Sequence, residues 1–99
     1  QQEIFGPVAA IAAYPDERSM LAAANATSAG LVAFAYTRDL DRALRIGEAL
    51  QAGMVGLNRG LVSNPAAPFG GVKQSGLGRE GGFEGIHEYL EVKYLAVQA

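Results

Sequence analysis

Nine of the chain's 13 glycines lie between Gly56 and Gly85, and this crowding is the feature that most limits the fold. The densest part is residues 68–82, which read PFGGVKQSGLGREGG. Each glycine costs roughly 0.5–1 kcal/mol relative to alanine in a regular element, and it is useful where φ is positive or another group comes very close. The sequence therefore predicts a loop whose path is dictated by a ligand, a neighbouring subunit or a tight backbone crossing.

The length and composition predict that the chain is part of a larger folded protein. A chain of 99 residues is long enough for one small domain, which would hide about 65% of the surface that the unfolded chain exposes. Glycine is well above its usual ~7%, and the many alanines bury little area, so the hydrophobic gain per ordered residue is low. We therefore expect the chain to be a piece of something larger, without an internal linker or repeat.

Charge and cysteine usage exclude several functions. The 8 basic and 10 acidic side chains give a net charge of -2 and are scattered, which argues against a nucleic-acid partner. No apolar stretch approaches the ~20 residues of a membrane span, and no targeting segment is recognisable, so we expect a cytoplasmic protein. The absence of cysteine excludes a disulfide, a thiolate metal site and a thiol nucleophile within this chain.

Hydrophobic patterning predicts alternating strands and helices. The apolar run at 8–14 is bounded by prolines and is too short for an independent helix, so it is predicted to be a buried strand. Asp16 is the expected N-cap of a helix that ends near Asn25. The later predictions are a strand at 31–36, a helix at 40–50, a strand at 54–58, the glycine-rich loop, a short helix at 83–90 and a final strand at 92–97.

The resulting order is βαβαβ, loop, αβ, and the predicted class is α/β. Such alternation favours parallel strands joined by helical crossovers, with ligands at the carboxyl ends of the strands. Asn58 and the loop that follows it lie at such an end.

Two phosphate-binding motifs are excluded by their context. Residues 76–81 match G-x-G-x-x-G, but no strand leads directly into them and no second strand with an acidic residue follows. Lys73 is followed by Gln74 and lacks the preceding glycine spacing of a phosphate loop.

Other polar or aromatic residues have ordinary explanations beside functional ones. His87 is more simply a solvated helix histidine than a catalytic base. The acidic cluster is read as a charged helix face instead of a metal site, and no metal is predicted; its members are Glu80, Glu84, Glu88 and Glu91. Phe69 either lines a pocket or serves as a packing anchor, and both explanations stay open.

Separated motifs resemble the C-terminal part of NAD(P)-dependent aldehyde dehydrogenases. In chain order they are EIFGPV from Glu3, TRDL from Thr37, GMVGLN from Gly53, and PFGG with KQSGLGRE from Pro68 to Glu80. The resemblance covers essentially the whole chain. The stretch NRGLVS, which ends at Ser63, is most similar to the succinate-semialdehyde dehydrogenase branch.

The resemblance implies roles for residues near both ends of the chain. Glu3 would bind the nicotinamide ribose of NAD or NADP, and Phe5 would pack near the nicotinamide ring. Ser63 would hydrogen-bond the distal carboxylate of succinate semialdehyde, and Phe69 would form a wall of the aldehyde pocket. Glu80 is the expected member of a proton relay behind the active site.

The resemblance also implies an assembly. Arg79 and Glu91 are similar to positions near a subunit interface, where they could form an interchain charge pair. Residues 1–91 would belong to the catalytic domain, and residues 92–99 would form an oligomerisation strand and the C-terminus. The dinucleotide-binding domain would lie outside this chain, in the remainder of the polypeptide.

One residue departs from the branch pattern, and a second function class stays open. Arg59 stands where many members of the branch carry an acidic residue before the GLVS stretch, so the exact aldehyde is not fixed. The alternative to a dehydrogenase fragment is a free-standing, non-catalytic interaction module that pairs its terminal strand with another sheet edge.

Family chemistry requires a cysteine thiolate, which this chain lacks. We therefore predict that the isolated 99-residue polypeptide, mixed with succinate semialdehyde and NAD+ or NADP+, gives no rise in reduced-nicotinamide absorbance. Turnover by the pure polypeptide would contradict this prediction.

Overall fold

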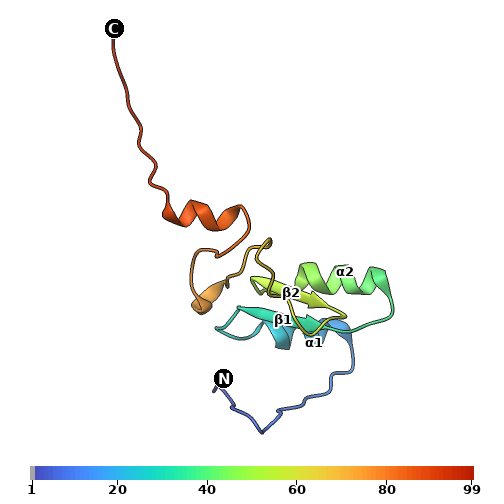
Figure 1. Cartoon of the computed structure of the whole chain (residues 1–99). Helices are drawn as coiled ribbons and strands as arrows, with labels where there is room; N and C mark the ends of the chain where they lie inside the picture. Colours follow the sequence, from blue (N-terminus) through green and yellow to red (C-terminus); the bar gives the residue numbers. More distant parts are fainter. Residues whose placement is uncertain (1) are drawn as a thin grey trace.

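The computed structural model describes residues 2–99 and contains a small α/β unit with an extended segment at each end (Figure 1). The helices and strands, in chain order, are α1 (Glu17–Asn25), β1 (Val32–Ala35), α2 (Leu40–Ala49) and β2 (Met54–Leu57). Two 3-10 helices follow, η1 (Lys73–Ser75) and η2 (Glu84–Tyr89). In residues 2–99, no helix is long and apolar enough to cross a membrane.

The β1–α2–β2 unit confirms the central part of the sequence prediction. β1 and β2 pair in parallel, with Val32 opposite Met54 and Ala35 opposite Leu57. α2 packs on this pair and contributes the buried side chains of Ala43 and Ile46. A helix between two adjacent parallel strands is the connection that alternating elements predict.

Both helices have an N-cap, and the cap at Asp16 is the predicted one. The Asp16 carboxylate accepts a hydrogen bond of 2.7 Å from the backbone N–H of Ser19, and the Asp39 carboxylate accepts one of 3.0 Å from Arg42. Each bond satisfies one of the backbone donors that the first turn of a helix leaves unpaired. The bonds from Ser19 also lower the pKa of the Asp16 carboxyl, because they stabilise its charged form.

α1 and α2 are joined to each other at both ends. Near their N-termini, the Nε of Arg42 lies 2.8 Å from a carboxylate oxygen of Glu17. At the other end, the side-chain amide of Asn25 donates to the carbonyl oxygen of Ala49 and accepts from the N–H of Gln51, both at 2.8 Å.

The strands predicted at 8–14 and 92–97 are not formed. Both segments run extended and exposed, with Ile11 at 91% and Val92 at 98% exposure (Figure 1). A strand needs a neighbouring strand to pair its backbone N–H and C=O groups. Within residues 2–99, neither segment belongs to a sheet. The prediction of strands at these two positions was therefore wrong for the described residues.

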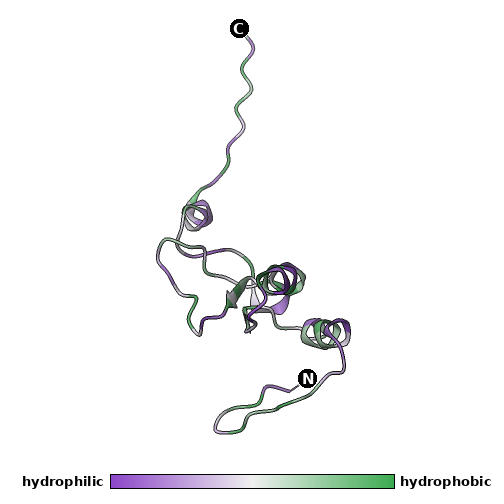
Figure 2. Cartoon of the chain, turned by 90° about the vertical axis from the view of Figure 1, so that its right-hand side faces the viewer, coloured by the Kyte–Doolittle hydropathy of each residue, from purple (hydrophilic) through white to green (hydrophobic). Residues whose placement is uncertain are grey.

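The chain is less compact than its length predicts. Its radius of gyration is 17.9 Å, whereas a compact domain of this size has about 13 Å. Its accessible surface is 8374 Å², compared with about 5,400 Å² for a compact protein of the same mass. Apolar residues occur along both extended segments (Figure 2). The expected burial of about 65% of the unfolded surface was therefore too high.

The glycine-rich loop makes a tight backbone crossing, which was one of the three predicted causes of its composition. A Cβ atom at Gly53 would overlap the carbonyl oxygen of Gly70 and lie 2.8 Å from the Cα of Gly71. The carbonyl oxygen of Gly30 accepts hydrogen bonds of 2.9 Å from the N–H groups of both Gly53 and Val72. The loop therefore lies directly against the start of β2.

We predict that Gly53→Ala lowers the free energy of unfolding by about 1–3 kcal/mol, because the new methyl group would meet the backbone of the crossing loop. The measurement is the urea midpoint of the polypeptide expressed from its full reading frame. Gly60→Ala is the matched control, since its nearest neighbour would be the hydroxyl of Tyr36 at 3.6 Å, an ordinary contact. Equal urea midpoints for Gly53→Ala and Gly60→Ala would show that the loop does not pack tightly against Gly53.

Candidate functional site

A pocket of about 300 Å³ brings together three of the residues singled out in the sequence. Ser63, Phe69 and Glu80 line it, although they come from different parts of the long segment after β2. The remaining lining residues are Asn64, Pro65, Ala67 and Gly81. A serine, a phenylalanine and a glutamate therefore line one hollow.

Phe69 and Glu80 are neighbours because their backbones pair. The N–H of each donates to the carbonyl oxygen of the other at 2.7 Å, which forms an isolated antiparallel bridge. This bridge closes the loop of residues 70–79. Phe69 lines the pocket and is 37% exposed, so it is not a fully buried packing anchor.

The segment that carries Ser63 is held by a turn and by one contact with the glycine-rich loop. The Asn64 side chain accepts a 3.0 Å bond from the N–H of Ala66, an arrangement that favours a tight turn. The carbonyl oxygen of Pro65 accepts a 3.1 Å bond from the N–H of Gly82. Gly82 adopts a positive φ of 59°, which glycine tolerates. These contacts place Ser63 beside the bridge.

Asn58 fixes the point where this segment leaves the sheet. Its side-chain amide accepts from the N–H of Thr37 and donates to the carbonyl oxygen of Thr37, both at 2.8 Å. Its φ is 54°, a left-handed conformation in which asparagine is enriched. The sequence predicts Asn58 at a strand end but does not predict this role. An asparagine directly after a strand was the available signal.

The two residues predicted to bind the cofactor lie apart from the pocket lining. Glu3 and Phe5 are on the extended segment before α1, and the Phe5 ring is 75% exposed. Both side chains are accessible, so a ligand could contact them. The structure does not bring them to Ser63, Phe69 or Glu80, and their roles stay predictions.

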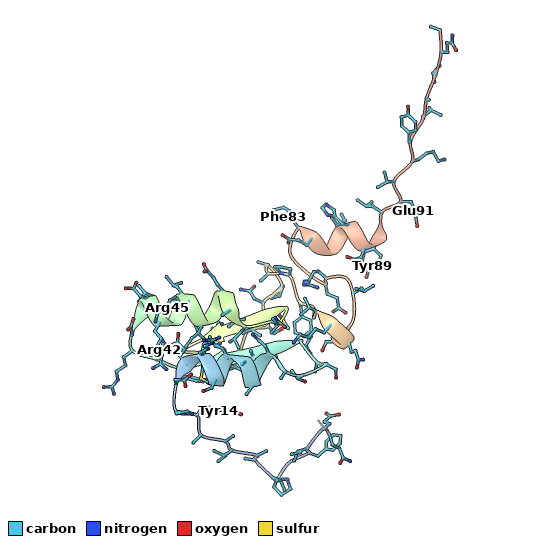
Figure 3. The ribbon with its side chains drawn as sticks, turned by 180° about the vertical axis from the view of Figure 1, so that it is seen from behind. Tyr14, Arg42, Arg45, Phe83, Tyr89 and Glu91 are labelled. Atoms are coloured by element: carbon cyan, nitrogen blue, oxygen red, sulfur yellow. The ribbon has the colours of Figure 1, made fainter. Side chains whose placement is uncertain are left out.

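The two predicted interface residues differ in their surroundings. Arg79 turns toward its own chain, and its Nη1 donates to the carbonyl oxygens of Gly71 at 2.8 Å and Gly78 at 2.7 Å. Glu91 is exposed where the C-terminal segment leaves η2 (Figure 3). Their pairing across an interface stays a prediction.

The remaining polar candidates do not form a further centre. His87 is exposed on η2, in the setting expected of a solvated helix histidine. Within residues 2–99, no group of three or more histidine, cysteine, aspartate or glutamate side chains is placed to hold a metal ion.

Comparisons with known proteins agree on one family. The family model described as "Aldehyde dehydrogenase family" matches residues 1–95. The chain is 58% identical over 93 residues to a succinate semialdehyde dehydrogenase of Acinetobacter baylyi, covering 94% of this chain and 19% of that protein. It is 53% identical over 97 residues to the succinate-semialdehyde dehydrogenase [NADP(+)] of Escherichia coli, covering 98% and 20%. The chain therefore spans about a fifth of the length of these curated relatives.

A solved structure supports the same assignment. An aldehyde dehydrogenase from Bacillus cereus, in complex with NAD+, superposes with a TM-score of 0.88 at 40% sequence identity. The match covers 94% of this chain and 19% of that one.

We predict that Asn58→Ala lowers the free energy of unfolding by about 2–4 kcal/mol, because it removes both bonds to Thr37 and leaves a non-glycine residue at positive φ. Asn58→Gly removes the same bonds without the conformational penalty and should cost less. Urea unfolding of both variants, in the polypeptide from the full reading frame, measures the difference. A glycine variant less stable than the alanine variant would contradict the prediction.

Proposed function

The chain belongs to the aldehyde dehydrogenase family, and we propose that it supplies part of the substrate pocket of an enzyme that oxidises succinate semialdehyde with NAD+ or NADP+. The observation that carries the proposal is the shared pocket of Ser63, Phe69 and Glu80. The printed names of the relatives from Acinetobacter baylyi and Escherichia coli support the choice of substrate.

The pocket has the chemistry to receive a short aldehyde with a carboxylate at its far end. The hydroxyl of Ser63 can donate a hydrogen bond to that carboxylate, and a bond to a charged acceptor is stronger than a neutral one. The ring of Phe69 can pack against the methylene groups and exclude water from them. We assign Glu80 to a proton relay behind the active site, as the family resemblance implies, since carboxylates are common general acids and bases.

The covalent step requires a residue from elsewhere in the polypeptide, because this chain contains no cysteine. In the proposed reaction a cysteine sulfur bonds to the aldehyde carbon and forms a thiohemiacetal. Loss of a hydride from that carbon gives a thioester, and water activated by a carboxylate base then releases the acid. A bound nicotinamide cofactor would accept the hydride.

Glu3 and Phe5 are the residues of this chain that we assign to the cofactor. A carboxylate accepts two hydroxyl donors well, which suits the ribose, and an aromatic ring excludes water beside the nicotinamide. Both side chains are exposed in this structure, so neither is committed to packing within the described residues. The proposal includes both cofactors and does not choose between them.

The exposed terminal segments support an assembly with more protein. Segments 8–14 and 92–97 expose large apolar side chains, with Ile11 and Val92 almost fully accessible. We propose that the remaining polypeptide covers the first segment, and that a second copy of the enzyme pairs with residues 92–99. Arg79 and Glu91 are the proposed charge pair of that interface. The proposal places the enzyme in the cytoplasm, as the sequence predicts.

The first test is the DNA sequence upstream of the codon for Gln1. A continuous reading frame with a dinucleotide-binding region and a cysteine supports the dehydrogenase. A start signal directly before Gln1 would instead favour the interaction module, whose specific support is the exposed, unpaired segment 92–97.

The second test is Ser63→Ala in the product of the full reading frame. We expect the KM for succinate semialdehyde to rise about tenfold or more, because a hydrogen bond to a charged group contributes about 1.5–3 kcal/mol. The KM for butanal, which has no carboxylate, should not change. Steady-state rates of reduced-nicotinamide formation give both values.

Ser63→Thr is the matched control, since threonine keeps the hydroxyl and should retain most of the affinity for succinate semialdehyde. An equal rise in KM for both aldehydes would show that Ser63 does not bind the carboxylate. Absence of turnover by the unsubstituted protein with either cofactor would overturn the proposed function itself.

A further inference from the structure

Lys73 has no chemical role once a phosphate loop is excluded, yet it has an unusual backbone conformation. Its φ is 58°, a left-handed value that strains a non-glycine residue. Within residues 2–99, Asn58 is the only other non-glycine residue with a positive φ. The side chain of Asn58 forms two hydrogen bonds with Thr37. The side chain of Lys73 likewise forms two hydrogen bonds.

The ammonium of Lys73 caps the C-terminal end of a distant helix. Its Nζ donates to the carbonyl oxygens of Asn25 at 2.8 Å and Thr27 at 3.1 Å. Asn25 is the last residue of α1, whose final turn contains no basic residue of its own. A helix C-terminus carries partial negative charge and unpaired carbonyl groups. Lys73 supplies the missing cation from 48 positions away in the sequence.

Backbone bonds surround this contact and attach the middle of the glycine-rich loop to the residues that connect α1 to β1. Val72 N–H donates to Gly30 O at 2.9 Å, and Gln74 N–H donates to Ser28 O at 2.9 Å. The hydroxyl of Ser75 accepts a 2.8 Å bond from the N–H of Gly30. We call residues 72–75 the anchor.

The anchor connects to the pocket wall through a short closed loop. Residues 70–79 leave the bridge at Phe69, pass through the anchor and return to the bridge at Glu80. Arg79 holds the two sides together, because its Nη1 donates to the carbonyl oxygens of Gly71 and Gly78. Ser63 lies outside this closed loop, next to the turn at Asn64 and near the bond from Gly82 N–H to the carbonyl oxygen of Pro65. A shift of the anchor is therefore expected to move Phe69 and Glu80 more than Ser63.

We propose that Lys73 is a positioning residue for the aldehyde pocket: its ammonium fixes the anchor on the end of α1, and the anchor sets where Phe69 and Glu80 stand. This inference rests on the proposed function for its effect on substrate. The structural link from Lys73 to the bridge is independent of the proposed function.

The test compares Lys73→Met, Lys73→Gly and Lys73→Arg in the polypeptide expressed from its full reading frame. Methionine keeps the length of the side chain but removes the ammonium. Glycine also removes it and adopts a positive φ without strain, so any defect that both variants share comes from the lost cation. Arginine keeps a cation that can reach the same carbonyl oxygens. Arg38→Met is the control for loss of one exposed positive charge.

The first readout is amide hydrogen exchange by mass spectrometry, which does not depend on activity. We expect peptides covering Phe69 and Glu80 to exchange about tenfold faster in Lys73→Met and Lys73→Gly. Peptides covering β1 and β2 should exchange as in the unsubstituted protein. Lys73→Arg and Arg38→Met should not change exchange at the bridge. Unchanged exchange at the bridge in Lys73→Met would overturn the inference, as would equal acceleration throughout the chain.

The second readout is the separation of KM from kcat. A displaced pocket wall raises the KM for succinate semialdehyde by about tenfold or more, since a misplacement of about 1 Å can cost on the order of 100-fold. Displacement of Glu80 also lowers kcat, and the KM for the cofactor stays unchanged. A protein that is only less stable loses active enzyme, and its apparent kcat falls while KM stays the same. If Lys73→Met exchanges faster at the bridge but keeps the KM of the unsubstituted protein, the proposed effect on substrate binding is wrong. The same conclusion follows if Lys73→Arg has the raised KM of Lys73→Met.

The two proposals fail in different ways. If the unsubstituted protein oxidises no aldehyde, the proposed function is wrong, and the hydrogen-exchange result still decides whether Lys73 positions the bridge. If the enzyme is active but Lys73→Met behaves like Arg38→Met in both readouts, the positioning role is wrong and the proposed function stands.

Discussion

The carbonyl oxygen of Gly30 is the constraint on which the rest of the structure depends. It accepts the N–H of Gly53, where β2 approaches β1, and the N–H of Val72 in the glycine-rich loop. Two segments can share one acceptor only if both come very close, and a side chain at Gly53 would prevent this. The start of β2 and the glycine-rich loop therefore meet at the segment that connects α1 to β1. The glycines at 53 and 71 are a consequence of this meeting, because a Cβ atom at either would press against the backbone there.

The sequence predicted those parts of the fold whose causes are local. The caps at Asp16 and Asp39, the spacing of apolar residues in α2 and the two short strands are all specified within a few residues of one another, and the structure contains them. The strands expected at 8–14 and 92–97 are absent as strands because no strand pairs with either segment within residues 2–99. Hydrophobic patterning indicates that a segment can be a strand, but it does not provide the neighbouring backbone.

The candidate site was predictable in composition but not in arrangement. Ser63, Phe69 and Glu80 were chosen from a family resemblance, and nothing in their spacing indicated that they would line one pocket. The backbone bridge between Phe69 and Glu80 brings two of them together, and bridges between irregular segments leave no periodic signal. The contact of Lys73 with Asn25 was equally hidden, since a capping residue is normally sought next to its own helix.

The anchor contacts residues far away in the sequence, and this separation predicts an order of folding. β1, α2 and β2 are close in sequence, so their contacts close short loops, whereas Ser75 meets Gly30 across 45 residues. Loops of that length are slower to close, and their closure forms no stabilising contacts until the sheet is in place. We therefore expect the pocket wall to be the last part of this unit to form. In pulse-labelled refolding, the amides of Phe69 and Glu80 would then gain protection after those of the sheet.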